Sequence, residues 1–152
     1  MTIRNFLTVA YFVLVTYAFS GGVLLGIVDY PLWKRISAED FPAFHRSYVR
    51  RTSIFYVPFV FLGVLANVVL IWFHHPAMST PLILIAAVLY LFIVVVTATL
   101  VIPIHKKLDQ AKSVELIDRI VKYHVYLRVI PGIIKMVVVV VLLYQVVSAS
   151  SR

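Results

Sequence analysis

Residues 81–104 read PLILIAAVLYLFIVVVTATLVIPI, a run of 24 residues without a charged side chain. A helix needs about 20 apolar residues to cross the hydrocarbon core of a bilayer. Inside lipid the backbone must satisfy its own hydrogen bonds, and a helix does so within one segment. This run therefore predicts a membrane-spanning helix.

Three further runs are equally apolar: 6–28 and 54–73, which contain no charge, and 130–147, which contains one. Together the four runs predict an all-α integral membrane protein, a four-helix bundle in a single transmembrane domain covering residues 1–152. The composition agrees, since 62% of the residues are hydrophobic and 13% are charged. A soluble domain of this size could not bury that much apolar surface, and a disordered chain would be far less hydrophobic. The absence of cysteine excludes a disulfide scaffold and thiolate metal ligands.

The first run also contains Ala18-Phe19-Ser20, which has the small-x-small spacing of a signal-peptidase site. Because the apolar run continues to Val28, we expect the span to be retained.

The net charge of +8 indicates how the bundle is oriented. The connection 74–80 contains no Lys or Arg, whereas the two longer connections hold 11 of the 14 basic residues. These are Lys34, Arg35, Arg46, Arg50, Arg51, Lys106, Lys107, Lys112, Arg119, Lys122 and Arg128. Cytoplasmic loops carry such an excess, so both long loops are predicted to lie in the cytoplasm and both termini outside, in a bacterial cytoplasmic membrane. Membrane lipids are the expected partners and nucleic acid is not.

Both long loops are predicted to contain amphipathic helices. One begins at Asp40 as N-cap and places Phe41, His45 and Tyr48 on one face. The other begins at Ser113 as N-cap and places Ile117, Ile120, Val121, His124 and Arg128 on one stripe. Each helix either lies at the membrane interface or extends the neighbouring span.

Gly22 and Gly26 form a small-xxx-small pattern in the first span. Such residues let two helix backbones approach closely in lipid. The pattern is equally compatible with chance, with packing inside the bundle and with a homo-oligomer formed through Gly22 and Gly26.

Three histidines, His45, His105 and His124, are predicted on the cytoplasmic side, each near a helix end. Three neutral imidazoles can bind a transition metal, and a haem is a further candidate cofactor. They could instead handle protons as general bases, or hydrogen-bond to their surroundings without a catalytic role. Arg51 and Arg128 are candidates for holding an anionic group or a developing oxyanion.

Lys135 is the single charge inside the fourth span. A side chain near the interface can snorkel to the membrane surface, which is the interpretation we favour. The alternative is that Lys135 reaches inward to Asp29 or to an anionic substrate. Asp29 and Lys135 are therefore candidate cofactor-binding residues.

Several short stretches carry a family resemblance: YPL at 30–32, FPAFH at 41–45 with Tyr48 and RR at 50–51, IPIHKKL at 102–108 and HVYLR at 124–128. They resemble uncharacterised bacterial four-helix integral membrane proteins and, more distantly, the DUF1772 or anthrone-oxygenase-like family. The distant resemblance implies an oxygenase that acts on a hydrophobic aromatic substrate such as an anthrone without a dedicated cofactor. It also implies a catalytic site made of His45, Arg51, His105, His124 and Arg128.

Two functional hypotheses follow. The first is an oxidoreductase or oxygenase with a cytoplasm-facing histidine and arginine pocket for a small hydrophobic substrate, with or without a bound metal. The second is a non-catalytic protein, either a membrane assembly subunit or a lipid- or ligand-binding module. A transporter has least support, because no span contains a carboxylate.

Overall fold

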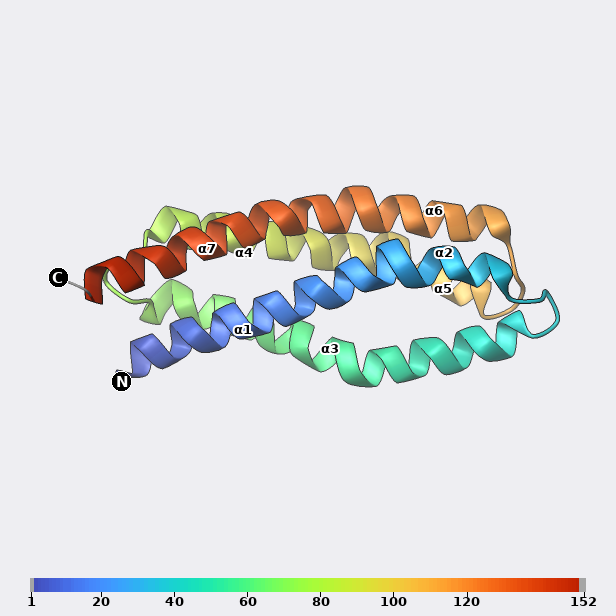
Figure 1. Ribbon diagram of the computed structural model, residues 1–152, viewed down its shortest axis with the longest axis horizontal. Coiled ribbons are helices and arrows are strands. Elements are labelled where there is room, and N and C mark those ends of the chain that lie inside the picture. Colours follow the sequence, from blue (N-terminus) through green and yellow to red (C-terminus); the bar gives the residue numbers. More distant parts are fainter. Residues whose placement is uncertain (1, 151–152) are drawn as a thin grey trace.

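The computed structural model describes residues 2–150 as four long helical rods that lie side by side (Figure 1). The first rod joins α1 (Ile3–Val23), η1 (Leu24–Asp29), α2 (Tyr30–Leu32) and η2 (Trp33–Arg35). The second is α3 (Phe41–Phe73) alone. The third joins α4 (Thr80–Val96), η3 (Thr97–Val101) and α5 (Ile102–Leu108), and the fourth joins α6 (Val114–His124), η4 (Val125–Val129) and α7 (Ile130–Ser150). All four rods are long and apolar enough to cross a membrane, which confirms the predicted all-α four-helix bundle.

The two ends of the bundle differ in what they carry. The N- and C-terminal ends of the chain lie together with the short connection between α3 and α4 (Figure 1). The two connections that follow η2 and α5 lie at the opposite end, which we call the loop end. The predicted basic loops therefore share one end of the molecule.

The predicted amphipathic helices are extensions of the spans and are not separate interface helices. α3 begins at Phe41 with Asp40 as its N-cap and continues unbroken to Phe73. α6 begins after Ser113, whose hydroxyl accepts a hydrogen bond from the Leu116 amide at 3.2 Å, and runs through η4 into α7. Both helices begin where they were predicted to begin, and Ser113 caps α6 as predicted. The Asp40 side chain makes no capping hydrogen bond and instead accepts one from the Ser37 hydroxyl at 2.6 Å. The alternative in which the helices lengthen the spans is confirmed.

Three of the rods widen into a short π-helix, and each widening has a proline two residues after its end. η1 precedes Pro31, η3 precedes Pro103 and η4 precedes Pro131. Proline has no N–H to donate and its ring crowds the carbonyl one turn earlier, so a wider turn relieves the local mismatch. In α3, Pro58 instead lies within a continuous α-helix that bends along its length (Figure 1).

The buried apolar side chains form two clusters. One lies toward the termini and includes Tyr11, Val15, Leu70, Ile83, Tyr90, Val139 and Leu142. The other lies at the loop end and includes Leu25, Tyr30, Trp33, Phe41, Leu108, Ile117 and Ile120. The surface between the rods and the lipid is also apolar, with Phe55, Trp72 and Val88 all more than 60% exposed. This distribution fits a protein whose solvent is lipid.

Candidate functional site

A cavity of about 510 Å³ lies inside the bundle and is lined by all four rods. Each π-helical segment contributes to its wall: Leu25 from η1, Thr97 and Val101 from η3, and Val129 from η4. The polar and charged side chains of the wall are Tyr30, Tyr48, Thr52, Ser53, Tyr56, Tyr90, Thr97, His105, Lys106, Asp109, His124, Arg128 and Lys135. The remaining wall is apolar, so the cavity suits a hydrophobic molecule with a few polar groups.

The exposed residues of the wall identify a mouth on the side of the bundle. They are Ser53 and Val57 on α3, and Ala98, Ile102 and Lys106 on η3 and α5. The other lining residues are buried or half-buried. The cavity thus opens sideways between α3 and the η3–α5 segment.

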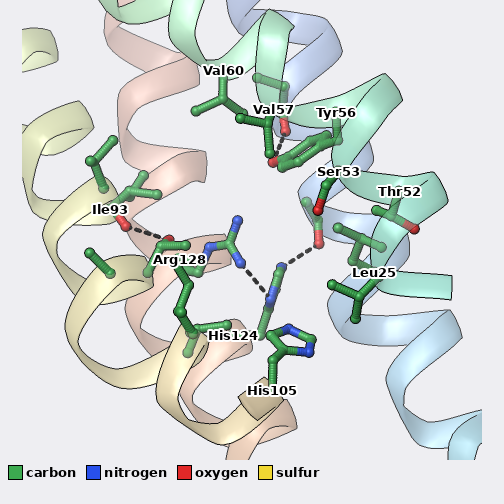
Figure 2. A pocket seen from close by; sticks show the side chains of 18 of the residues that line it. Leu25, Thr52, Ser53, Tyr56, Val57, Val60, Ile93, His105, His124 and Arg128 are labelled. Atoms are coloured by element: carbon green, nitrogen blue, oxygen red, sulfur yellow. Dashed lines mark hydrogen bonds between the residues drawn. The ribbon is translucent and has the colours of Figure 1, made fainter. Parts of the chain in front are cut away.

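Arg128 projects from η4 into the cavity, facing the side chains that α3 contributes (Figure 2). Its Nη1 donates a hydrogen bond to Nδ1 of His124 at 3.0 Å. The opposite nitrogen of that ring, Nε2, donates to the Gly22 carbonyl at 2.7 Å. His124 is therefore held as the neutral tautomer protonated on Nε2, and it fixes the direction in which the guanidinium points.

Glycines in the first rod make room for this arrangement. A Cβ added at Gly26 would stand 3.0 Å from Cγ of His124, and one at Gly22 would stand 3.9 Å from its Nε2. The small-xxx-small pattern therefore packs the first rod against the fourth within one chain. Self-association through Gly22 and Gly26 stays a prediction, and Gly26 is already buried by this internal contact.

Two tyrosines, Tyr30 and Tyr56, line the cavity together with Arg128. Tyr56 donates to the Ala18 carbonyl at 2.7 Å (Figure 2). The Nε atom of Arg128 is buried and has no hydrogen-bond partner in the described part of the chain. No ion pair within the described residues involves the guanidinium, so its charge has no carboxylate partner there.

A second polar chain leads from the cavity toward the loop end. The Tyr30 hydroxyl lies 3.5 Å from Nε2 of His105, a long contact. Nδ1 of His105 lies 3.1 Å from Nε2 of His45, and Nδ1 of His45 lies 2.7 Å from the Asp109 carboxylate. Because the carboxylate can only accept, His45 donates to Asp109 and accepts from His105. Nε2 of His105 is then left as an acceptor at the cavity wall.

His45 does not reach the cavity itself. It is fully buried, stacked on Phe41 at 5.5 Å and edge-on to Trp33 at 4.9 Å between ring centroids. Arg46 holds the loop beyond it by donating to the Asp109 carbonyl at 2.7 Å. His45 therefore positions His105, and the aromatic rings around it fix its orientation.

Lys135 lines the cavity and is only 3% exposed. Its ammonium stands 3.4 Å above the centroid of the Tyr90 ring, a cation–π contact. The prediction that Lys135 snorkels to the membrane surface is wrong, because the side chain points into the bundle.

The remaining predicted site residues lie away from these groups. Asp29 accepts a hydrogen bond from the Tyr48 hydroxyl and does not pair with Lys135. Arg51 is exposed on α3 and is not part of the cavity wall. The structure thus brings together His105, His124, Arg128 and Lys135 around one cavity, with His45 directly behind.

The three predicted metal ligands do not converge on one point. The Tyr30 ring contacts both His105 and His124, at centroid distances of 5.8 and 5.1 Å, and both nitrogens of His124 are already hydrogen-bonded. Within residues 2–150, no group of three or more histidine, aspartate or glutamate side chains is arranged to hold a metal ion. The metal site at His45, His105 and His124 stays a prediction.

Four tyrosines of the wall were not among the predicted site residues: Tyr30, Tyr48, Tyr56 and Tyr90. Tyr30 lies in the YPL stretch and Tyr48 falls three residues after His45, so both belong to the stretches that carry the family resemblance. Tyr56 and Tyr90 are polar groups in otherwise apolar spans, which is a signal for an interior position.

The fold and the site define a class of protein: a four-helix membrane bundle with an internal cavity lined by tyrosine, histidine and arginine. The sequence matches the anthrone oxygenase family over residues 44–126, just over half of the chain, and the chain belongs to that family. The matched range includes His45, His105 and His124 and excludes Arg128 and Lys135. No curated protein and no solved structure matches the sequence.

Proposed function

We propose that this protein is a membrane oxygenase whose cavity binds a small hydrophobic aromatic substrate such as an anthrone. The family's name supports the reaction class and the substrate type. The observation that carries the proposal is the Arg128 guanidinium, which points into a largely apolar cavity and forms no ion pair within the described residues. A substrate oxygen that becomes negative during the reaction would find its stabilising charge there.

The sideways mouth fits the solubility of such a substrate. A fused aromatic ketone partitions into the bilayer, where the opening between α3 and the η3–α5 segment meets it. Once inside, the ring system can pack on the apolar wall while its oxygen lies against Arg128. Water is poorly accommodated by that wall, which strengthens the interaction between the guanidinium and an oxyanion.

Each polar group then has a distinct role in the proposed reaction. The proton leaves the acidic C–H of the substrate for Nε2 of His105, either directly or through the Tyr30 hydroxyl. The electron pair of the broken C–H bond moves to the carbonyl oxygen, and Arg128 stabilises the resulting enolate. His45 and Asp109 stabilise the charge gained by His105.

Molecular oxygen is the oxidant that completes the proposed reaction. The electron-rich enolate carbon forms a bond to one oxygen atom, and the other oxygen leaves as water. One anthrone and one O₂ give one anthraquinone and one water, so atoms and electrons balance. In this scheme His124 is a positioning residue that acts through Arg128.

Oxygen uptake by the purified full-length protein tests the proposal. With anthrone as substrate, Arg128→Gln should lower kcat/KM by a factor of about 10² to 10³, the usual effect of losing one oxyanion-stabilising donor. Arg35→Gln is the matched control, because Arg35 is exposed at the loop end and is not part of the wall. Wild-type protein that takes up no oxygen with anthrone, or an Arg128→Gln variant as active as wild type, would refute the proposal and favour a non-catalytic ligand-binding protein.

We also propose that the loop end, with Asp109, faces the cytoplasm of a bacterial cell. The basic residues of the two long connections support this orientation. The chain has no cysteine, so Thr80→Cys and Gln110→Cys each create a unique labelling site, at opposite ends of the bundle. A membrane-impermeant maleimide should label intact cells at position 80 and not at position 110; the reverse pattern would overturn the orientation.

A further inference from the structure

The fourth rod carries two cations into the same cavity, and neither is neutralised by a carboxylate. Of the six acidic residues, five have other partners: Asp29 with Tyr48, Asp40 with Ser37, Asp109 with His45, Glu115 with Arg119 and Asp118 with Lys34. The sixth, Glu39, is exposed in the connection before α3. The positive charge of Arg128 and Lys135 therefore has no compensation within residues 2–150.

The two cations lie at different depths. They are seven residues apart on one rod, which places them about two helical turns, or about 10 Å, from one another along the axis. Arg128 lies toward the loop end beside His124, whereas Lys135 contacts Tyr90, a member of the apolar cluster toward the termini. Lys135 thus marks the closed end of the cavity.

The surroundings of Lys135 in the described part of the chain hold its ammonium in place but give it no hydrogen-bond acceptor and no negative charge. Tyr90 donates its hydroxyl to the Val60 carbonyl at 3.1 Å, which fixes the ring beneath the ammonium. Gly63 makes room for that ring, because a Cβ there would stand 3.2 Å from its Cε1 atom. No hydrogen bond or ion pair formed within the described residues involves the ammonium. Burial without a partner makes the charged form of this amine costly, and an anionic group bound beside it would offset that cost.

We propose that Lys135 and Tyr90 form an anion-binding subsite at the closed end of the cavity, which selects aromatic ligands that carry a carboxylate about 10 Å from the oxygen bound by Arg128. The ring system of the ligand spans the apolar wall between the two cations. This inference rests on the proposed function, since it narrows the substrate class of the same cavity. It also assigns a role to a residue outside the range matched by the family.

The test compares two probes that differ in one group: an anthraquinone carboxylate and its neutral carboxamide. Their affinities for the full-length protein in nanodiscs can be read from tryptophan fluorescence quenching, because Trp33 lies in the cluster beside the cavity. Wild-type protein should bind the carboxylate at least about tenfold more tightly than the carboxamide, the size expected for one charge-assisted contact. Empty nanodiscs correct for partition of the probes into lipid.

Variants locate the preference. Lys135→Met keeps the length of the side chain and removes its charge, so the ratio of the two affinities should fall to about one. Lys135→Arg keeps the charge and should retain a clear preference, which guards against a variant that merely misfolds. Lys122→Met is the matched control, because Lys122 is exposed on the same rod. No carboxylate preference in the wild type, or a preference that survives Lys135→Met, would overturn the subsite.

The outcome is separable from that of the proposed function. If the protein shows a Lys135-dependent carboxylate preference but takes up no oxygen with anthrone, the subsite proposal is supported and the oxygenase proposal is refuted. If the protein takes up oxygen with anthrone but shows no carboxylate preference, the oxygenase proposal is supported and the subsite proposal is refuted.

Discussion

Replacing Gly26 by alanine should destabilise the protein far more than the same change at Gly22, one turn away. A Cβ at Gly26 would stand 3.0 Å from Cγ and 3.3 Å from Nε2 of His124. At Gly22 the nearest atoms are the Tyr56 hydroxyl oxygen at 3.3 Å and His124 Nε2 at 3.9 Å. The first position requires the imidazole to move, and the second requires only a small shift of a side chain.

The size of the effect follows from how His124 is held. The ring is fully buried and uses both nitrogens, so it cannot retreat without breaking a bond to Gly22 or Arg128. Overpacking costs about 1–3 kcal/mol, and a lost hydrogen bond to a charged group about 1.5–3 kcal/mol. The helix propensity gained on replacing glycine by alanine, about 1 kcal/mol, applies to both variants and cancels in their comparison. We therefore expect Gly26→Ala to be less stable than Gly22→Ala by about 3 kcal/mol.

Thermal unfolding in nanodiscs, followed by tryptophan fluorescence, measures this difference. For a chain of this length it corresponds to a Tm lower by about 6–12 °C. In a His124→Ala background the clash disappears, so the two alanine variants should then differ by less than about 1 kcal/mol. Equal losses at both glycines, as a shared self-association surface would give, would refute the reasoning. A difference that persists without the imidazole would do so as well.

Two further changes test other parts of the site. Gly63→Ala should cost about 1–3 kcal/mol of stability, because its Cβ would collide with the Tyr90 hydroxyl and stand 3.2 Å from the Tyr90 ring. In chemical denaturation, adding Tyr90→Phe, which removes that hydroxyl, should recover part of the loss. No recovery would contradict the packing argument. Asp109→Asn should lower kcat for anthrone oxygenation by about tenfold or more and leave KM nearly unchanged, because His45 loses its carboxylate acceptor. Steady-state oxygen uptake measures both constants. An unaltered kcat would show that the His105–His45–Asp109 chain takes no part in the mechanism.

Most of the fold could be predicted from the sequence, because the solvent imposes it. Four apolar runs of sufficient length, with Lys135 as their single charge, leave helices as the economical structure in lipid. Asp40 and Ser113 mark where two of the helices begin. The π-helical segments could not be predicted, because they change the number of residues per turn without changing hydrophobicity. Pro31, Pro103 and Pro131 were visible, yet a proline alone does not determine whether a helix bends or widens.

The residue types of the site could be predicted better than the exact residues and their contacts. The candidate residues were chosen because they lie near helix ends on one side of the bundle, and the structure places His105, His124 and Arg128 in the wall of one cavity. Arg51 was predicted with them, but it is exposed on α3, where Thr52 and Tyr56 line the cavity instead. The division of labour between the histidines depends on which atoms lie within hydrogen-bond distance, and residue spacing does not reveal it.

The source of the oxygen atom in the product tests the central claim most directly. Purified wild-type protein is supplied with anthrone under ¹⁸O₂ in ordinary water, and the anthraquinone is analysed by mass spectrometry. The proposed oxygenation predicts one ¹⁸O atom per product molecule, formed at a rate that falls in Arg128→Gln and not in Arg35→Gln. Product that carries only oxygen from water, or that forms equally fast without the protein, would contradict the account.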